Sequence, residues 1–265
     1  MRMKSIAVAA LILCLSFVVL ITNGCVEARS SQQAQISATE IKLRHAYEAK
    51  YFKMSVLEYK TFKKDIQTEL PTWKRYFKKY SKKYNVPWTL IAAVAYQESR
   101  WNEDAKSYTG VKGFMQITEK TANYIGIEDR EDPIESIQGG AYYLRYLFDK
   151  TPTKLSNVDR WIQALAAYNV GVAHVSDVHR LAKLKKVDAY QWSHLKRLLP
   201  ELTKHKNKKH LRYGLARGHE TVAFIENVIS FNAILNFHFT QQLPTSRDFL
   251  ADLRRNPNDQ LSGRP

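Results

Sequence analysis

The chain has 265 residues, of which 45% are hydrophobic and 12% aromatic, and its formal net charge at pH 7 is +16. This apolar content is sufficient for a packed core, which excludes a wholly disordered chain. The positive charge favours a polyanionic partner, and nucleic acid, anionic lipid headgroups and the carboxylate-bearing cell wall are the candidates.

The first 25 residues have the pattern of an export signal. Arg2 and Lys4 precede an almost unbroken apolar run over 6–21, which is short for a membrane span and the right length for a signal peptide. The run ends in a segment that resembles a bacterial lipobox, in which Cys25 would be lipidated, although Thr22 stands where Leu is usual. Ordinary cleavage after Ala28 and a permanent N-terminal anchor helix are the alternatives.

We therefore expect an exported protein in the periplasm, anchored to the outer membrane through lipidated Cys25. Export favours the wall and the membrane surface as partners and argues against nucleic acid. The processed chain would contain no cysteine, because Cys14 lies in the discarded segment, so we expect neither disulfides nor thiol chemistry.

Residues 26–69 are predicted to form a tether and a basic N-terminal helical segment. The tether is rich in Ser, Gln and Ala, and the helical pattern begins at Ile41. The helical, basic pattern continues beyond this segment to about Tyr84, and the stretch WKRYFKKYSKK at 73–83 interleaves lysines with aromatic residues. This pattern is typical of a solvated face over packed aromatics, and a dedicated anion-binding surface is the alternative.

Residues 70–240 show helical patterns and no convincing strand alternation, so we predict an all-α domain. Pro87 opens one helix, and Thr118 and Asp132 are expected caps of two later ones. One apolar stripe comprises Ile134, Ile137, Ala141, Leu144 and Leu147, and another comprises Trp161, Ile162, Leu165 and Ala166. The segment 219–237 is apolar on several faces, which is typical of a central helix. The tail, 241–265, loses this periodicity and is expected to be loosely held.

Glu98 is the first candidate for chemistry, because helical spacing places it on the same face as Leu90, Ile91 and Val94. Apolar surroundings disfavour the charged carboxylate, so its pKa should rise and make it a proton donor near neutral pH. Pairing with an arginine, or a position at the helix edge, is the structural alternative.

Two other segments are candidates for a polar site. Gly110 and Gly113 would let the loop backbone pass close to a ligand or another helix. Tyr168 and Asn169 precede Gly171 at a predicted helix end, where they could bind a polar ligand or simply cap the helix. The eight histidines show no metal-ligand spacing, and we expect no metal and no cofactor.

Three motifs occur in order, ES at 98–99, GFMQ at 113–116 and AYN at 167–169, and a late aromatic helix follows them. Together they resemble the soluble lytic transglycosylase family over about residues 70–237. The resemblance implies an all-α, goose-type-lysozyme-like fold with an extra N-terminal basic helical segment. Residues 213–231 more closely resemble membrane-bound members, which carry a solute-binding-like domain before the catalytic one. This sequence has no room for such a domain, so we expect a catalytic module alone.

The resemblance also implies the chemistry. Glu98 would act alone as acid and base, cleaving the bond between N-acetylmuramic acid and N-acetylglucosamine in peptidoglycan and leaving a 1,6-anhydro ring. Ser99 would orient Glu98, Met115 and Gln116 would line the sugar subsite, and Tyr168 and Asn169 would close the site.

Two residues depart from the family pattern: Phe114 replaces the usual Leu, and Phe224 replaces a late Tyr and so lacks its hydroxyl. A hydrolytic muramidase on the same fold and a non-catalytic peptidoglycan-binding lipoprotein are the alternative functions. We expect a monomer.

Overall fold

The computed structural model describes residues 52, 54–107 and 110–240. The signal segment, Cys25, the tether and the tail lie outside these residues, so the predictions for them stay predictions. The chain divides into two compact units, 1–60 and 61–265. The second unit contains the whole region predicted as the catalytic domain, although the predicted boundary at residue 70 stays a prediction.

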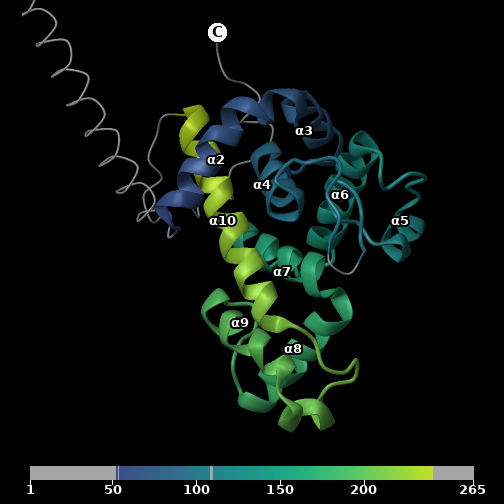
Figure 1. Ribbon diagram of the computed structural model, residues 1–265. Coiled ribbons are helices and arrows are strands. Elements are labelled where there is room, and N and C mark those ends of the chain that lie inside the picture. The colour runs from purple at the N-terminus through teal and green to yellow at the C-terminus, as the bar shows by residue number, and fades with distance from the viewer. Residues whose placement is uncertain (1–51, 53, 108–109, 241–265) are drawn as a thin grey trace, which may run out of the picture. The chain divides into compact units, whose positions relative to one another are not determined.

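The described residues form helices and no strands, which confirms the predicted all-α class. Figure 1 labels the α-helices. In chain order the elements are α2 (Val56–Thr68), α3 (Leu70–Tyr84), α4 (Trp88–Ser99), α5 (Glu119–Ile125), α6 (Pro133–Asp149), α7 (Asn157–Val170), α8 (Val172–Lys185), α9 (Trp192–Leu198), the 3₁₀ helices η1 (Leu199–Thr203) and η2 (His205–His210), and α10 (Gly218–Thr240).

The helix starts follow the capping residues of the sequence. The Thr118 side chain accepts a hydrogen bond from the Thr121 amide before α5, and Asp132 accepts one from the Glu135 amide before α6. Both bonds satisfy amides that have no partner within the helix. Pro87 is the N-cap of α4 and so lies one residue before the helix that it was expected to open.

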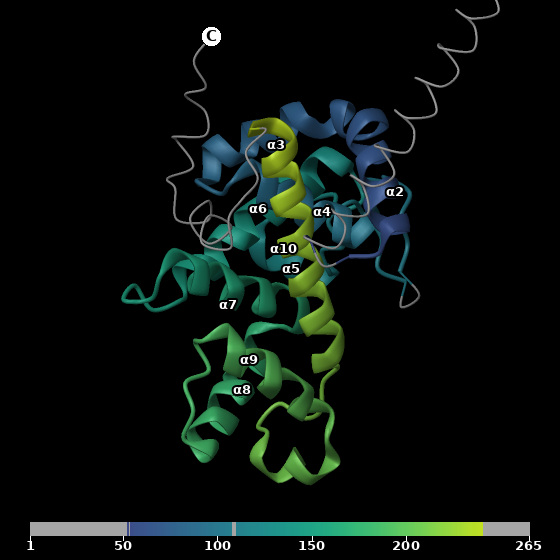
Figure 2. The same cartoon turned by 90° about the vertical axis from the view of Figure 1, so that its left-hand side faces the viewer.

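The central helix is α10, as its apolar faces predict. It packs against α4, α7 and η1, and Figures 1 and 2 both show it running past α4 and α7. By length and composition alone it could cross a membrane, but 56% of its most apolar window is buried inside the protein. A helix enclosed by its own domain passes the same test, so we assign α10 to the core.

The predicted apolar stripes lie in the core. On α6, four of the five stripe residues are buried and Ile134 is partly exposed, and on α7 all four are buried. Both helices lie beside the catalytic candidates, because α6 packs on α3, α4 and α7 while α7 packs on α10.

Candidate active site

Glu98 lies at the end of a helix that is otherwise enclosed by protein. Within α4 only Gln97 and Glu98 keep partial exposure. No hydrogen bond or ion pair to the Glu98 carboxyl is found among the described residues. Burial raises its pKa to about 8, so the carboxyl holds its proton at neutral pH, as the sequence predicts.

The nearest arginine in sequence does not neutralise Glu98. The Arg100 guanidinium instead donates to the Tyr96 hydroxyl at 3.0 Å, and the Tyr96 hydroxyl donates to Asp65 at 2.6 Å. The structural alternative, a buried Glu–Arg pair, is therefore not what holds this carboxyl.

A strained turn ends α4 immediately after the Glu98–Ser99 pair. Arg100 and Trp101 both have left-handed backbone, with φ of 54° and 59°. The buried Trp101 indole fixes this turn by donating to the Ala92 carbonyl at 2.9 Å. Two consecutive non-glycine residues in this region are costly, and such strain is concentrated at functional sites.

Ser99 makes a different contact from the one expected. Its hydroxyl donates to the Ala95 carbonyl, one turn earlier, at 3.0 Å. This bond lies within the helix, so in the structure Ser99 stabilises the end of α4 and does not orient the Glu98 carboxyl directly.

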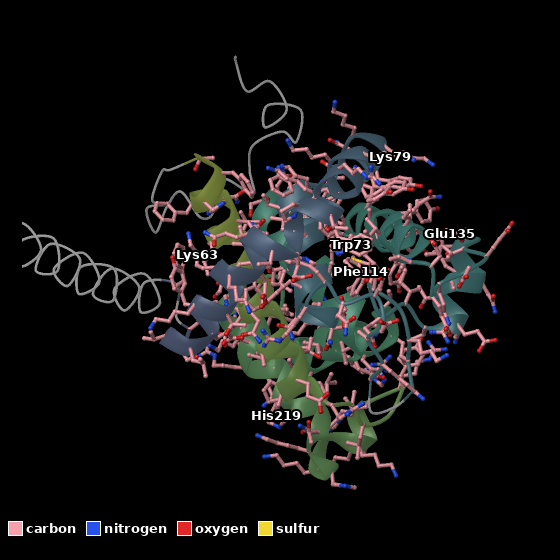
Figure 3. The ribbon with its side chains drawn as sticks, turned by 45° about the horizontal axis from the view of Figure 1, so that its top comes forward. Lys63, Trp73, Lys79, Phe114, Glu135 and His219 are labelled. Carbon is pink, nitrogen blue, oxygen red and sulfur yellow. The ribbon has the colours of Figure 1, made fainter. Side chains whose placement is uncertain are left out.

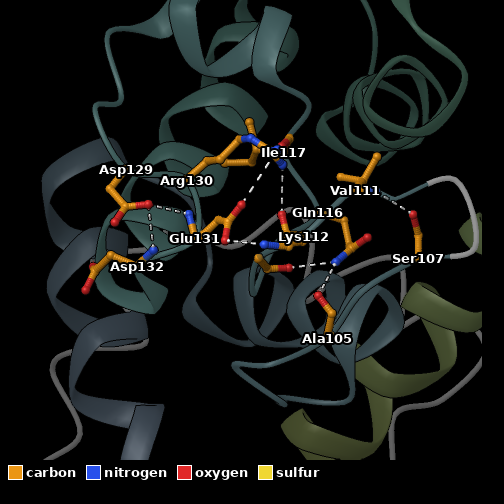
Figure 4. Close-up of polar contacts among 11 residues, drawn as sticks. Ala105, Ser107, Val111, Lys112, Gln116, Ile117, Asp129, Arg130, Glu131 and Asp132 are labelled. Carbon is orange, nitrogen blue, oxygen red and sulfur yellow. Dashed lines mark hydrogen bonds and ion pairs between the residues drawn. The ribbon is translucent and has the colours of Figure 1, made fainter.

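The loop that carries GFMQ is held by its own polar groups (Figure 4). The Gln116 amide nitrogen donates to the carbonyls of Ala105, at 3.3 Å, and Gly113, at 2.8 Å. The Arg130 guanidinium donates to the Lys112 carbonyl at 3.1 Å. The amide nitrogen of Gln116 is therefore engaged with the loop, and contact of Gln116 with a sugar stays a prediction.

Met115 is fully buried and connects the loop to two helices. Its amide donates to the Ser136 hydroxyl of α6 at 3.0 Å, and its carbonyl accepts from the Tyr168 hydroxyl of α7 at 2.9 Å. The side chain packs on Gly140, where a Cβ atom would lie only 2.5 Å from it. The structure thus gives Met115 a packing role, and contact with a sugar stays a prediction.

Phe114 packs on the inner side of α3. Its ring centroid lies 4.6 Å from that of Trp73, and Figure 3 shows the two labelled side by side. The larger ring that replaces the usual Leu is therefore accommodated by an aromatic cluster in the core.

Tyr168 connects Glu98 to the late aromatic residue. Burial, and then the neighbouring Glu98 charge, raise the pKa of the Tyr168 hydroxyl well above its usual value. The Tyr168 ring stacks on Phe224, with centroids 6.3 Å apart and planes 8° from parallel. The structure thus brings together Glu98, Tyr168, Phe224 and the Met115 carbonyl.

Asn169 connects α7 to α10. It is exposed, and its side-chain oxygen accepts a hydrogen bond from the Thr221 hydroxyl of α10 at 2.8 Å. Contact between Asn169 and a ligand stays a prediction.

Three supporting residues escaped the sequence analysis. Ser136 is completely buried beneath the loop, Arg130 clamps the loop, and Tyr143 lies 5.7 Å from Tyr168 between ring centroids. Of the three, only Ser136 could have been found from the sequence, because it is a small hydroxyl residue beside the apolar stripe of α6. No group of His, Cys, Asp or Glu among the described residues is arranged to hold a metal ion.

A pocket of about 430 Å³ lies beside the strained turn. Glu98 is not among the residues that line it, which are Asp65, Glu69, Thr72, Trp73, Arg100, Trp101, Asn102, Glu103 and Asp104. Glu103 and Asp104 are exposed, as the sequence predicts.

Gly113→Ala should disrupt the loop, because Gly113 has φ of 107° and a Cβ atom there would lie 2.3 Å from the Arg130 carbonyl oxygen. We expect a loss of about 3 kcal/mol or more in unfolding free energy, measured by denaturant titration. Gly110→Ala is the matched control: φ is 83° and no atom lies within 4 Å of the added Cβ. It should cost only about 1 kcal/mol. Equal losses in the two variants would show that the close approach to Arg130 is unimportant. The structure already corrects the expectation of a close approach at Gly110, where only the backbone angle favours glycine.

Comparison with known proteins indicates the family of this domain. The family model described as the transglycosylase SLT domain matches residues 75–191. Membrane-bound lytic murein transglycosylase F of Stutzerimonas stutzeri is 39% identical over 209 residues, which cover 78% of this chain and 42% of the relative. The protein of the same name from Maricaulis maris is 42% identical over 174 residues, covering 66% and 38%. The chain thus spans less than half the length of these curated relatives.

The fold has a counterpart among solved structures. The 70-kDa soluble lytic transglycosylase, solved in complex with bulgecin A, is 22% identical, with a TM-score of 0.51 over 77% of this chain and 31% of that chain. This likeness concerns the fold alone. The domain match and the sequence relatives, by contrast, show that the chain carries a domain of the transglycosylase SLT family.

Proposed function

We propose that this protein is a murein lytic transglycosylase, which cleaves the β-1,4 bond between N-acetylmuramic acid and N-acetylglucosamine in peptidoglycan. The observation that carries the proposal is the Glu98 carboxyl, which is desolvated, has no ion-pair partner among the described residues and has a pKa of about 8. Relatives named lytic murein transglycosylase support the same reaction.

Protonated Glu98 donates its proton to the glycosidic oxygen, and the bond from that oxygen to C1 of the muramic sugar breaks. The N-acetylglucosamine end leaves as an alcohol. The positive charge that develops at C1 resembles an oxocarbenium ion. Burial of Glu98 assists this step, because a carboxyl that is a poor anion is a ready donor.

Ionised Glu98 then takes the proton of the muramic 6-hydroxyl, whose oxygen bonds to C1 and closes the 1,6-anhydro ring. Glu98 returns to its protonated state, and no water is consumed. One carboxyl thus does the work that most glycosidases divide between two, consistent with the exposed positions of Glu103 and Asp104.

The remaining residues position this acid and the sugar. Tyr168 lies within electrostatic range of Glu98 and holds the GFMQ loop through the Met115 carbonyl. The Gln116 amide oxygen and the Asn169 amide nitrogen are the groups we assign to the substrate. Phe224 keeps the stacked ring but provides no hydroxyl, which favours a slow enzyme, or the non-catalytic wall-binding alternative.

The decisive experiment is digestion of purified sacculi followed by mass spectrometry of the soluble products. Products that end in 1,6-anhydromuramic acid support the proposal. Reducing muramic ends would indicate a hydrolytic muramidase, and binding without soluble products would indicate a wall-binding protein; either result overturns the proposal.

We further propose that the protein works in the cell envelope as a monomer anchored to the outer membrane through lipidated Cys25. The relatives named membrane-bound support an envelope location. Metabolic labelling with a fatty acid should mark the wild-type protein in the outer-membrane fraction and leave Cys25→Ala unlabelled. Labelling that persists in Cys25→Ala contradicts the anchor.

A further inference from the structure

The outer face of α3 carries basic side chains and no acidic one. Residues 70–84 contain no Asp or Glu. The basic face of α3 comprises Lys74, Arg75, Lys78, Lys79, Lys82 and Lys83, which are exposed except for the partly buried Lys74. At 3.6 residues per turn these cations spread over about 180° of a helix about 22 Å long. The buried residues Trp73 and Phe77 lie on the opposite side, and Figure 3 shows Lys79 at the outer side of α3.

These charges are not neutralised within the described residues. None of the six has an ion-pair partner there, whereas Lys112 pairs with Glu131 and Arg145 with Asp149. Burial and the repulsion of Lys78 lower the pKa of Lys74. Like charges this close destabilise the folded state, and an anionic surface would remove that cost.

Aromatic rings accompany the cations. The Lys74 ammonium lies 3.8 Å from the centroid of Phe239, a ring that is 39% exposed at the end of α10. The Lys79 and Lys83 ammonium groups lie 5.1 and 5.2 Å from the rings of Tyr80 and Tyr84. Lysines next to amphipathic aromatics are typical of surfaces that meet lipid headgroups.

We propose that the basic face of α3 docks the domain on a membrane surface rich in anionic phospholipid. Clusters of four to eight Lys or Arg bind such surfaces, and each charge contributes on the order of a fivefold gain in affinity. Because the apolar side of α3 is already buried in the protein, binding is peripheral and involves no insertion of the helix.

The shape of the face favours a membrane over a wall strand or another polymer. Sites that hold a chain are concave and follow it along a groove. The basic face is instead the convex half of a helix, whose charges point over a wide arc. A lipid surface presents many phosphates in two dimensions and can meet several of these charges at once.

The test compares two variants that each lose four positive charges from different places. The face variant is Lys78→Gln, Lys79→Gln, Lys82→Gln and Lys83→Gln. The matched control is Lys154→Gln, Lys206→Gln, Lys208→Gln and Lys209→Gln, four exposed lysines elsewhere in the described chain. The affinity of the full chain is measured for phosphatidylglycerol–phosphatidylcholine vesicles and for pure phosphatidylcholine vesicles. The ratio of the two affinities cancels any apolar or acyl contribution from the N-terminus.

The face variant should lower this ratio on the order of 10²–10³-fold, while the control and the Lys→Arg version of the face stay near wild type. Circular dichroism establishes that each variant is folded. Equal losses in face variant and control would mean that binding follows net charge alone, and an unchanged ratio in the face variant would mean that α3 is not involved. If the face variant instead loses only its binding to purified sacculi, the face belongs to the wall polymer. Each of these three results overturns the proposal.

Discussion

Glu98→Gln should lower the rate of sacculus digestion by about 10²–10⁴-fold or more, because it removes the general acid while keeping the size of the side chain. Glutamine cannot give up a proton to the glycosidic oxygen or take one from the 6-hydroxyl, so both halves of the proposed reaction fail. The measurement is the release of soluble muropeptides over time, with circular dichroism to establish an intact fold.

The matched control is Glu103→Gln, which removes one carboxylate five residues further along the chain. Glu103 is exposed, and the proposed mechanism gives it no part. It should digest sacculi at the wild-type rate. If Glu103→Gln is as inactive as Glu98→Gln, the reaction uses two carboxylates, and the single-acid mechanism is wrong.

Activity should fall by close to tenfold for each pH unit above about 8, because the reaction begins with protonated Glu98 and burial raises the pKa of Glu98 to about 8. An exposed glutamate would already have lost its proton near pH 4.3, and activity would then decline throughout the neutral range. Initial digestion rates measured from pH 5 to 10 on identical sacculi distinguish the two cases.

The same pKa has a consequence for stability. The carboxyl binds its proton more tightly in the folded chain than in the unfolded one. The stability that depends on this proton is therefore fully present below about pH 4.3 and is lost as pH rises through 8. The loss amounts to a few kcal/mol. Glu98→Gln, which has no charge to bury, should therefore be more stable than wild type at pH 9 and similar to it near pH 4. A difference in denaturation midpoint that does not change with pH would contradict a buried, ionisable Glu98.

Residue pattern alone predicted the features that depend on local sequence. The caps Thr118 and Asp132 were identified because a hydroxyl or carboxylate before an apolar repeat satisfies free amides at a helix start. The central position of α10 followed from its apolar faces. The environment of Glu98 followed from its place at the end of the apolar face of α4.

Long-range contacts were not predictable in this way. The Met115 amide is satisfied by Ser136, 21 residues away, and its carbonyl by Tyr168, 53 residues away. Nothing in the local pattern of the GFMQ loop indicates either partner. Ser99 and Gln116 differ from the prediction for a local reason. The Ser99 hydroxyl and the Gln116 amide nitrogen bond to carbonyls only four and three residues away, which compete with the partners assigned to them from the sequence.

The most direct test is a ¹³C NMR titration of the Glu98 side-chain carboxyl, assigned by its absence from the spectrum of Glu98→Gln. A titration midpoint near 8 is the result that a desolvated catalytic acid requires. A midpoint near 4.3, the value of a carboxyl in water, would show that Glu98 is ionised at neutral pH and cannot start the reaction.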